Sequence, residues 1–219
     1  MIWGLTFKLG GLYFNTFRKP TSTSAILTYS VPPFTTIRGL LSNALGLQRD
    51  DFSLQDSFKI GIKSVMTRDA SRELAKILKL KGTGKHYQRS FPSAPIFKEF
   101  LVKPSYEIFL VGDQEIIAGL YEAISDPKRP LYLGGSDELV EIEYSKPTMV
   151  REITASEVHS AVEGVHPNSI VEKLPYKFTK RGRDYSLEYL TVSVPQADAI
   201  DLSDPVKCFV FGSVNVAAY

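Results

Sequence analysis

One stretch, residues 29–46 (YSVPPFTTIRGLLSNALG), constrains the fold most strongly because it contains a complete helix signal. Its apolar residues recur at helical spacing and predict one buried stripe, formed by Ile37, Leu40, Leu41, Ala44 and Leu45. Pro32 and Pro33 prevent an earlier start of the helix, and Gly46 suits a left-handed C-terminal cap.

The first turn of this helix combines groups that bind phosphate. Thr35 or Thr36 is expected to cap the turn, and Arg38 and Ser42 are expected to face away from the apolar stripe. Free N–H groups, hydroxyls and a guanidinium would then lie close together, and such a group can hold phosphate. An ordinary capped helix with a solvated arginine fits the same residues, so this stretch alone leaves both interpretations open.

The composition is that of an ordinary globular protein, because 43% of the 219 residues are hydrophobic and 23% are charged. No apolar run approaches the roughly 18–20 residues that a membrane helix needs, and the first residues lack the pattern of a signal peptide. Cys208 is the one cysteine, so no internal disulfide and no cysteine-based zinc site can form. We expect a cytoplasmic protein without membrane contact and without a metal or other cofactor.

The charges are segregated along the chain although the formal net charge is only +2. Residues 59–103 contain eleven basic and three acidic side chains, whereas residues 104–172 contain four basic and thirteen acidic ones. Such segregation favours one face for a polyanion and another face for a different partner. Chance clustering on a solvated surface explains the same counts, and both interpretations stay open.

Periodicity predicts strands and helices that alternate over the first two thirds of the chain. Strands are expected over 2–9 and 58–66, over two halves of 96–111, and on either side of a glycine turn within 129–144. Helices are expected over 68–80 and over 114–125, the second capped by Asp113. In the last third, short strands are expected around 147–153, 173–179, 184–194 and 206–217.

This order of elements predicts an α+β fold. A βαββαβ layout is the ferredoxin-like fold that RNA-recognition modules share, and its sheet is a platform for RNA. We therefore predict a ferredoxin-like (RRM-like) N-terminal domain over 1–145, with a basic insertion over 67–100, and a small β-rich C-terminal subdomain over 146–219.

Cations, hydroxyls and aromatic residues gather in several loops. FRKPTSTS places Arg18 and Lys19 before a run of hydroxyls, which suits phosphate and sugar contacts. GTGKHYQRS interleaves cations with aromatic rings, as sites for single-stranded RNA do, although a basic loop without RNA contact also fits. Gly-Gly after a strand lets backbone approach a ligand, but it lacks the spacing of a nucleotide-cofactor fingerprint. The candidate RNA-binding residues are Arg18, Lys19, Tyr29, Thr36, Arg38, Lys63, Lys85, His86, Arg89, Gly134 and Gly135.

Four stretches, taken together and in order, resemble the family-five CRISPR-associated (Cas) proteins: FRKPTSTS, TYSVPPFTTIRGLLSNALG, KEFLVKPSYEIFLV and RPLYLGGSDELVEI. Members of this family are RAMP-type subunits of type I Cascade complexes. The resemblance covers residues 1–145, and the first helix with its Pro-Pro approach is its most specific part. It implies a ferredoxin-like domain and a basic β-hairpin, the thumb, in the interval where residues 67–100 lie.

The resemblance also implies a function and partners. The chain would be a non-catalytic subunit that binds the guide RNA (crRNA) and caps its repeat-derived 5′ handle, while the thumb contacts the backbone (family-seven) subunit. Arg18, Lys19, Thr36 and Arg38 would hold handle phosphates, and the turn at 134–136 would lie near the RNA path. The acidic segment would face away from the RNA, towards the large subunit.

One branch of the family, in type I-C systems, cleaves pre-crRNA without metal, so a metal-independent endoribonuclease is the alternative function. That branch has a tyrosine near the end of the first helix, where this chain has Leu45, and a Lys-His pair in the second helix, where this chain reads EIIAGLYEAIS. Lys85 and His86 lie earlier, in the thumb interval. These departures favour RNA binding without cleavage. A structural protein that uses its basic face for acidic partners is a further hypothesis.

Overall fold

A central antiparallel sheet organises the molecule, whose computed structural model describes residues 1–66, 70–78, 93–182 and 184–219. Its strands are β1 (Trp3–Gly11), β4 (Phe58–Met66), β7 (Ser105–Gly112), β8 (Val140–Tyr144) and the short β9 (Thr148–Met149). The strand order is β4-β7-β1-β8, β9 pairs with β1, and every pair is antiparallel. The strands expected over 2–9 and 58–66 are confirmed.

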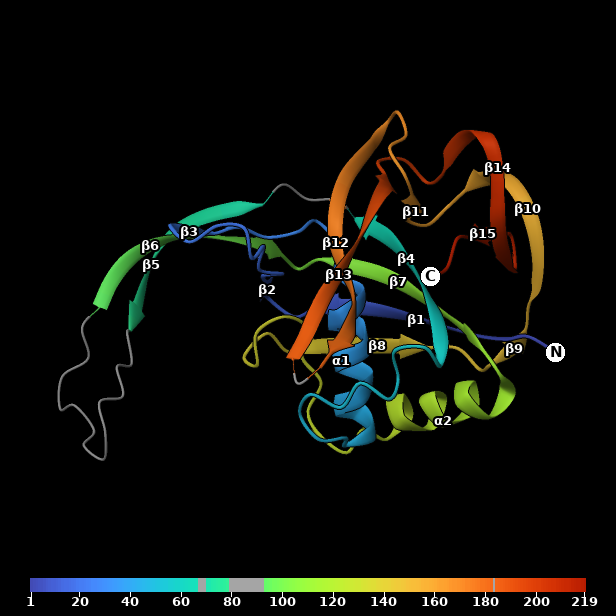
Figure 1. The fold of residues 1–219 in the computed structure, drawn as a ribbon, viewed down its shortest axis with the longest axis horizontal. Helices are drawn as coiled ribbons and strands as arrows, with labels where there is room; N and C mark the ends of the chain where they lie inside the picture. The colour runs from blue at the N-terminus through green and yellow to red at the C-terminus, as the bar shows by residue number, and fades with distance from the viewer. Residues whose placement is uncertain (67–69, 79–92, 183) are drawn as a thin grey trace.

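Two helices, α1 (Phe34–Leu45) and α2 (Gln114–Ser125), pack on one face of this sheet (Figure 1). The bounds of α2 are those expected from the sequence, although the side chain of Asp113 makes no capping hydrogen bond. The predicted stripe of α1 is buried at Ile37, Leu40, Leu41 and Ala44. These side chains join those of β1, β4 and β7 in the main hydrophobic cluster.

The predicted cap of α1 is correct at its C-terminal end and wrong at its N-terminal end. Gly46 adopts the predicted left-handed conformation, with φ of 72°. At the other end, Pro33 occupies the N-cap position, and its carbonyl accepts the N–H of Thr36 over 2.9 Å. Neither Thr35 nor Thr36 caps the first turn, which corrects the expectation, because the helix begins at Phe34, two residues earlier than a Thr35 cap and three earlier than a Thr36 cap would need.

A smaller sheet extends from the body of the molecule as an arm. It contains β2 (Phe14–Asn15), β3 (Ala25–Ile26), β5 (Ser71–Leu78) and β6 (Ser93–Val102), with β6 pairing with the other three. In Figure 1 the paired strands β5 and β6 project far from α1 and α2. The helix expected over 68–80 is wrong, because this segment pairs with β6 from Ser71 to Leu78. Strand pairing with a distant partner overrides the local helical period.

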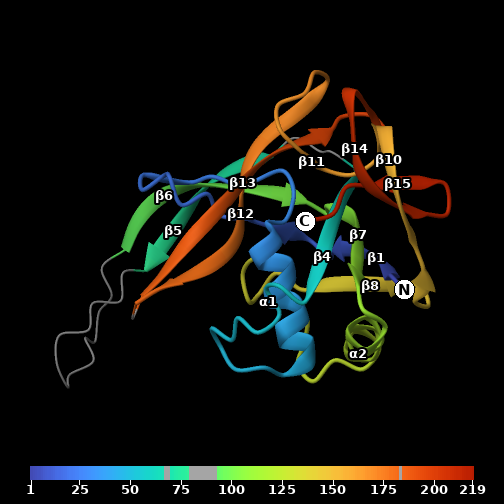
Figure 2. The same cartoon turned by 45° about the vertical axis from the view of Figure 1, so that its right-hand side comes forward.

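The last third of the chain is rich in strands, as expected. Its strands are β10 (Arg151–Val158), β11 (Val162–Glu163), β12 (Ser169–Arg181), β13 (Asp184–Pro195), β14 (Ile200–Phe211) and β15 (Val214–Val216). They form two sheets of three strands, ordered β10-β14-β15 and β11-β13-β12. The long β12–β13 hairpin lies against α1 (Figure 2).

Hydrophobic packing joins the last third of the chain to the first two. The main cluster contains Leu174, Val192 and Val194 together with the helices. On the opposite face of β7, a separate cluster joins Phe109 and Val111 to β14 and β15. Gly61 permits this approach, because a Cβ there would clash with the side chain of Val216. No helix in the described residues is long and apolar enough to cross a membrane.

Candidate nucleic-acid interface

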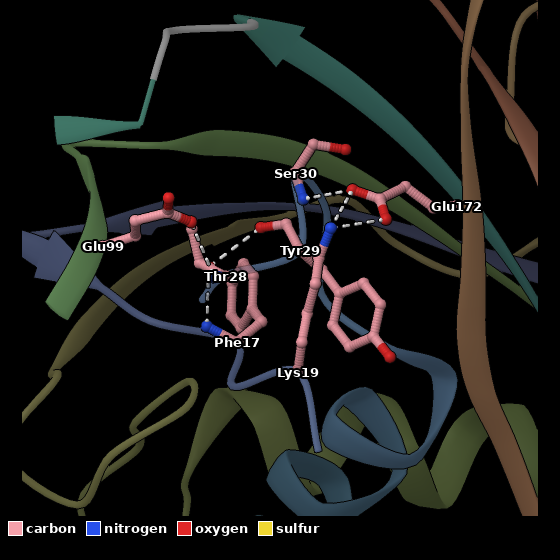
Figure 3. A network of polar contacts seen from close by, with 7 residues as sticks. All are labelled: Phe17, Lys19, Thr28, Tyr29, Ser30, Glu99 and Glu172. Carbon is pink, nitrogen blue, oxygen red and sulfur yellow. Dashed lines mark hydrogen bonds and ion pairs between the residues drawn. The ribbon is translucent and has the colours of Figure 1, made fainter. Parts of the chain in front are cut away.

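The segment between β2 and α1 is held in place by a polar network (Figure 3). The backbone N–H of Phe17 donates to Thr28 Oγ1 over 2.9 Å, and the Thr28 hydroxyl donates to the Tyr29 carbonyl over 2.9 Å. The backbone N–H of Thr28 donates to the Glu99 carboxylate over 3.3 Å, which ties the segment to β6. Arg18 bridges to Thr28 through its backbone, and its side chain is exposed.

Lys19, the next cation, is bound by the protein itself. Its Nζ lies 3.0 Å from Glu172 Oε2 on β12 and 5.0 Å from the centroid of the Tyr29 ring. The same carboxylate accepts the backbone N–H of Ser30 over 3.1 Å (Figure 3). Because the Glu172 side chain is only 9% exposed, its charge needs these partners. Lys19 therefore fastens the loop to β12, and its charge is already neutralised.

Tyr29 is buried rather than open to a base. Its side chain is 5% exposed and packs in the main hydrophobic cluster. Burial, followed by the nearby Tyr189 and Glu172, raises the pKa of Tyr29 to about 12, so the phenol is neutral at physiological pH.

Arg38 is also buried, which corrects the expectation that it faces away from the core. It is 5% exposed, and its Nη1 donates to the Tyr176 carbonyl over 2.6 Å. The guanidinium carbon lies 5.3 Å from the centroid of the Tyr176 ring. Burial lowers the pKa of Arg38, against the opposing effect of Tyr176. The expectation fails because β12 covers the polar side of α1.

Gln55 closes the edge of β12 next to this contact. Its Nε2 donates to the Phe178 carbonyl over 2.9 Å, and its Oε1 accepts the Phe178 N–H over 2.5 Å. One side-chain amide thus satisfies a strand edge as a neighbouring strand would. Arg38 and Gln55 together dock the β12–β13 hairpin on the N-terminal part of the molecule.

Lys63 forms a third contact between the two parts of the chain. Its Nζ lies 2.6 Å from Asp198 Oδ1, and its side chain is 15% exposed. The hydrogen bond and charge of Lys63 hold the pKa of Asp198 below its ordinary value. Lys63, a predicted RNA-binding residue, is therefore engaged within the protein, whereas Lys59 on the same strand is exposed.

Four of the predicted residues, Arg18, Thr36, Gly134 and Gly135, line one groove of about 470 Å³. We call it the glycine-turn groove. Its further lining includes Thr16, Thr35, Lys98, Pro175 and Leu187. Asp137 and Glu138 also line this groove, and no ion pair within the described residues involves the exposed Arg18 side chain.

The glycine turn is fixed by a buried carboxylate that the sequence did not reveal. Glu138 is 7% exposed and accepts the N–H groups of Thr16 and Gly135, each over 2.9 Å. Lys98 Nζ lies 3.6 Å from the same side chain. Gly134 has φ of 102°, and a Cβ there would clash with Glu138, so glycine is required. Because Thr16 and Lys98 are distant in sequence, no local pattern indicates Glu138.

The remaining predicted residues, Lys85, His86 and Arg89, lie outside the described residues. Leu45, at the position where the processing branch has its tyrosine, is partly buried against the main cluster. No group of three or more metal-binding side chains occurs within the described ranges.

The sheet, its two helices and the covering β12–β13 hairpin define a class of fold seen among CRISPR proteins. The chain is similar to a structure of a CRISPR RNA-guided surveillance complex, with a TM-score of 0.55, 14% identity and coverage of 93% of this chain and 91% of that one. It is similar to the crystal structure of a CRISPR protein from Archaeoglobus fulgidus, with a TM-score of 0.57, 12% identity and coverage of 99% and 98%. At these identities the likeness shows the fold alone.

The family follows from the sequence itself. The model of the family described as CRISPR-associated protein (Cas_Cas5) matches residues 4–204, and the chain belongs to this family. No curated protein matches the chain.

Proposed function

We propose that the chain is a non-catalytic crRNA-binding subunit of a CRISPR effector complex of the type I Cascade kind, and that it caps the 5′ handle of the guide RNA. The observation that carries the proposal is the convergence of Arg18, Thr36 and the turn at 134–135 on one groove. These residues lie on three separate segments, and family membership supplies the ligand class.

The chemistry of the glycine-turn groove suits an RNA phosphate. Among the described residues no side chain caps the first turn of α1, and the Pro33 carbonyl accepts the N–H groups of Thr36 and Ile37. The earlier N–H groups of the turn and the positive end of the helix dipole therefore remain for an anion. Arg18 adds a charge that can make paired hydrogen bonds with phosphate oxygens. The glycine turn lets the RNA backbone approach the chain closely.

The order of elements supports the domains that the proposal needs. β1, α1, β4, β7, α2 and β8 follow one another as in a ferredoxin-like domain, which we place over 1–145, with a β-rich subdomain over 146–219. The projecting β5–β6 pair would be the thumb that contacts the backbone subunit. On it Leu74 and Phe97 are register partners, 64% and 53% exposed, so they present one apolar pair to a protein partner.

The acidic strand β8 supports a different neighbour. Glu141 is exposed there, and Glu143, which is 81% exposed, lies 3.8 Å from Lys8. We assign this side of the sheet to the large subunit of the complex, away from the RNA.

The absence of cleavage is part of the proposal. Leu45 has no group that can act as a general acid or base, and α2 contains neither a lysine nor a histidine. The positions that carry the cleaving residues in the processing branch therefore lack them here, and this supports binding of the RNA without activation of its 2′-hydroxyl.

The test is to mix the purified full chain with end-labelled repeat RNA in EDTA and to run native and denaturing gels side by side. We expect a shifted RNA that stays intact. A discrete cleavage product would overturn the non-catalytic assignment and make Lys85 and His86 the first residues to substitute. If no RNA shifts alone or with the backbone subunit, RNA capping is wrong.

A further inference from the structure

A second groove, of about 530 Å³, lies along α1 and is not used by the proposed phosphate contacts. Its walls come from α1, from the loop after α1, from the segment 129–132 and from Phe178 on β12. We call it the aromatic groove, because Phe52, Tyr132 and Phe178 line it.

The aromatic groove continues the glycine-turn groove. Thr35 lines both. On β12, Pro175 lines the first and Phe178 the second, three residues or about 10 Å further along the strand. The segment that bears Gly134 in the first groove bears Tyr132 in the second. One extended ligand can therefore occupy both grooves.

The aromatic wall is suited to stacking. The ring of Phe52 lies 4.9 Å from the ring of Phe178 and 4.6 Å from that of Tyr185, measured between centroids. Tyr132, which lines the groove, is 37% exposed, and Tyr185, which packs on Phe52 but is not part of the lining, is 51% exposed. A partly open row of rings gives a planar ligand a surface on which to stack.

A buried donor without a partner lies at the same place. Arg38 lines the aromatic groove, is only 5% exposed, and its Nε has no partner among the described residues. Arg129 is already engaged, because it donates to the carbonyls of Gly46 and Leu47. The described residues therefore leave one donor of the Arg38 guanidinium unpaired beside the groove.

The acidic residues that line the groove are engaged locally. Asp50 lies 3.7 Å from Arg49, and the carboxylate of Asp51 accepts the backbone N–H of Ser53 over 2.9 Å. With Arg38 and Arg129, the groove lining carries more positive than negative side chains. This balance suits an anionic RNA strand.

We propose that the aromatic groove holds one unstacked base of the single-stranded RNA whose phosphates lie in the glycine-turn groove. This proposal rests on the proposed function and adds a base-binding site to it. Stacking on Phe52 and Phe178 supplies affinity for any base, and the positive charge of Arg38 and Arg129 in the lining attracts the RNA strand. A peptide is a weaker fit because it offers fewer planar groups to this wall.

The test measures the affinity of the full chain for the repeat RNA with one nucleotide at a time made abasic. The variants are Phe52→Leu and, as a matched control, Phe211→Leu. Phe211 is also half-buried and packs on another ring, that of Phe109 at 5.0 Å, but it lies with β14 on the opposite face of the sheet.

For the unaltered chain we expect one abasic position to weaken binding about tenfold, because the stacking of that base on the aromatic rings is lost. Phe52→Leu should weaken binding of intact RNA by a similar factor and remove the extra loss at that position. Phe211→Leu should keep the original profile.

Binding that tolerates every abasic position would overturn this inference and leave RNA capping intact, and a peptide-binding groove would give that result. A sensitive position that Phe52→Leu does not alter would also overturn it. Absence of binding to every RNA would contradict the proposed function as well.

Discussion

Lys19, Arg38 and Lys63 each connect the N-terminal sheet and helices to the C-terminal strands. Their partners are Glu172, the Tyr176 carbonyl and Asp198, at 3.0, 2.6 and 2.6 Å. A cation that is hydrogen-bonded and largely buried cannot also be a freely exposed phosphate ligand. At this scale Arg18 differs from the three, because its exposed side chain lines a groove and has no acidic partner in the described residues.

Arg38→Ala should lower the free energy of unfolding by about 1.5–3 kcal/mol, as expected for loss of a hydrogen bond from a charged group. The change leaves the Tyr176 carbonyl without its donor and weakens the docking of β12. Urea unfolding of both chains measures the difference. Arg49→Ala is the control, because Arg49 is 95% exposed and should change stability by less than about 0.5 kcal/mol. Equal stability of the two variants would mean that Arg38 does not dock the hairpin.

Lys63→Met should raise the pKa of Asp198 towards its ordinary value, because the hydrogen bond and charge of Lys63 hold it low. A carboxyl with a lowered folded-state pKa stabilises the fold above its unfolded value of about 3.9, and this contribution is lost as pH falls through the folded pKa. A pH titration of the Asp198 carboxyl by NMR measures the change.

Lys207→Met, which removes a surface ion pair with Glu152 at 3.4 Å, is the control and should leave the titration of Asp198 where it was. If Lys63→Met also left it there, the ion pair between β4 and the β13–β14 loop would not exist in solution.

At the scale of elements, α1 is the part of the fold that local pattern specifies best. Leu41→Ala should cost about 2–5 kcal/mol of stability, because Leu41 is 0% exposed in the main cluster and its loss leaves a cavity. Leu74→Ala makes the same chemical change on β5, where the side chain is 64% exposed, and should cost far less. Thermal or urea unfolding compares them, and similar losses would show that the stripe of α1 is not the buried one.

Periodicity predicted the elements whose own residues decide their structure. Both helices and the strands β1 and β4 follow from a buried stripe or from alternation. β5 does not, because residues 71–78 carry a helical pattern and become a strand only by pairing with β6. The prediction that Arg38 faces solvent is wrong for a related reason, because the carbonyl that accepts its hydrogen bond lies 138 residues away on β12. Contacts of that sequence separation leave no local signal.

The residues of the candidate site also divide into those that the sequence could predict and those that it could not. Arg18, Thr36 and the glycine turn could be chosen from residue type, since hydroxyls, cations and glycines suit phosphate. Glu138, which holds the turn, and Phe52 and Phe178, which line the aromatic groove, could not. Their roles depend on segments that meet only in the folded molecule.

At the scale of the whole molecule, the C-terminal strands complete the site. Pro175, Leu187 and Phe178 form walls of the two grooves that α1 and the glycine turn begin. The hairpin that carries them is fixed by Glu172, Tyr176 and Phe178, so the grooves depend on the contacts between the two parts of the chain. We therefore expect this chain to lose affinity for RNA when one of these docking contacts is removed, even when the substituted residue does not contact RNA.

The most direct test of the RNA assignment is the salt dependence of affinity for the repeat RNA. The logarithm of the binding constant should fall linearly with the logarithm of salt concentration. Arg18→Ala should make the slope shallower by about 0.7, the value expected when one phosphate of a single strand is no longer neutralised by the protein. Arg151→Ala, an exposed arginine on β10, should leave the slope unchanged. Equal slopes for the unaltered chain and Arg18→Ala would contradict the placement of an RNA phosphate in the glycine-turn groove.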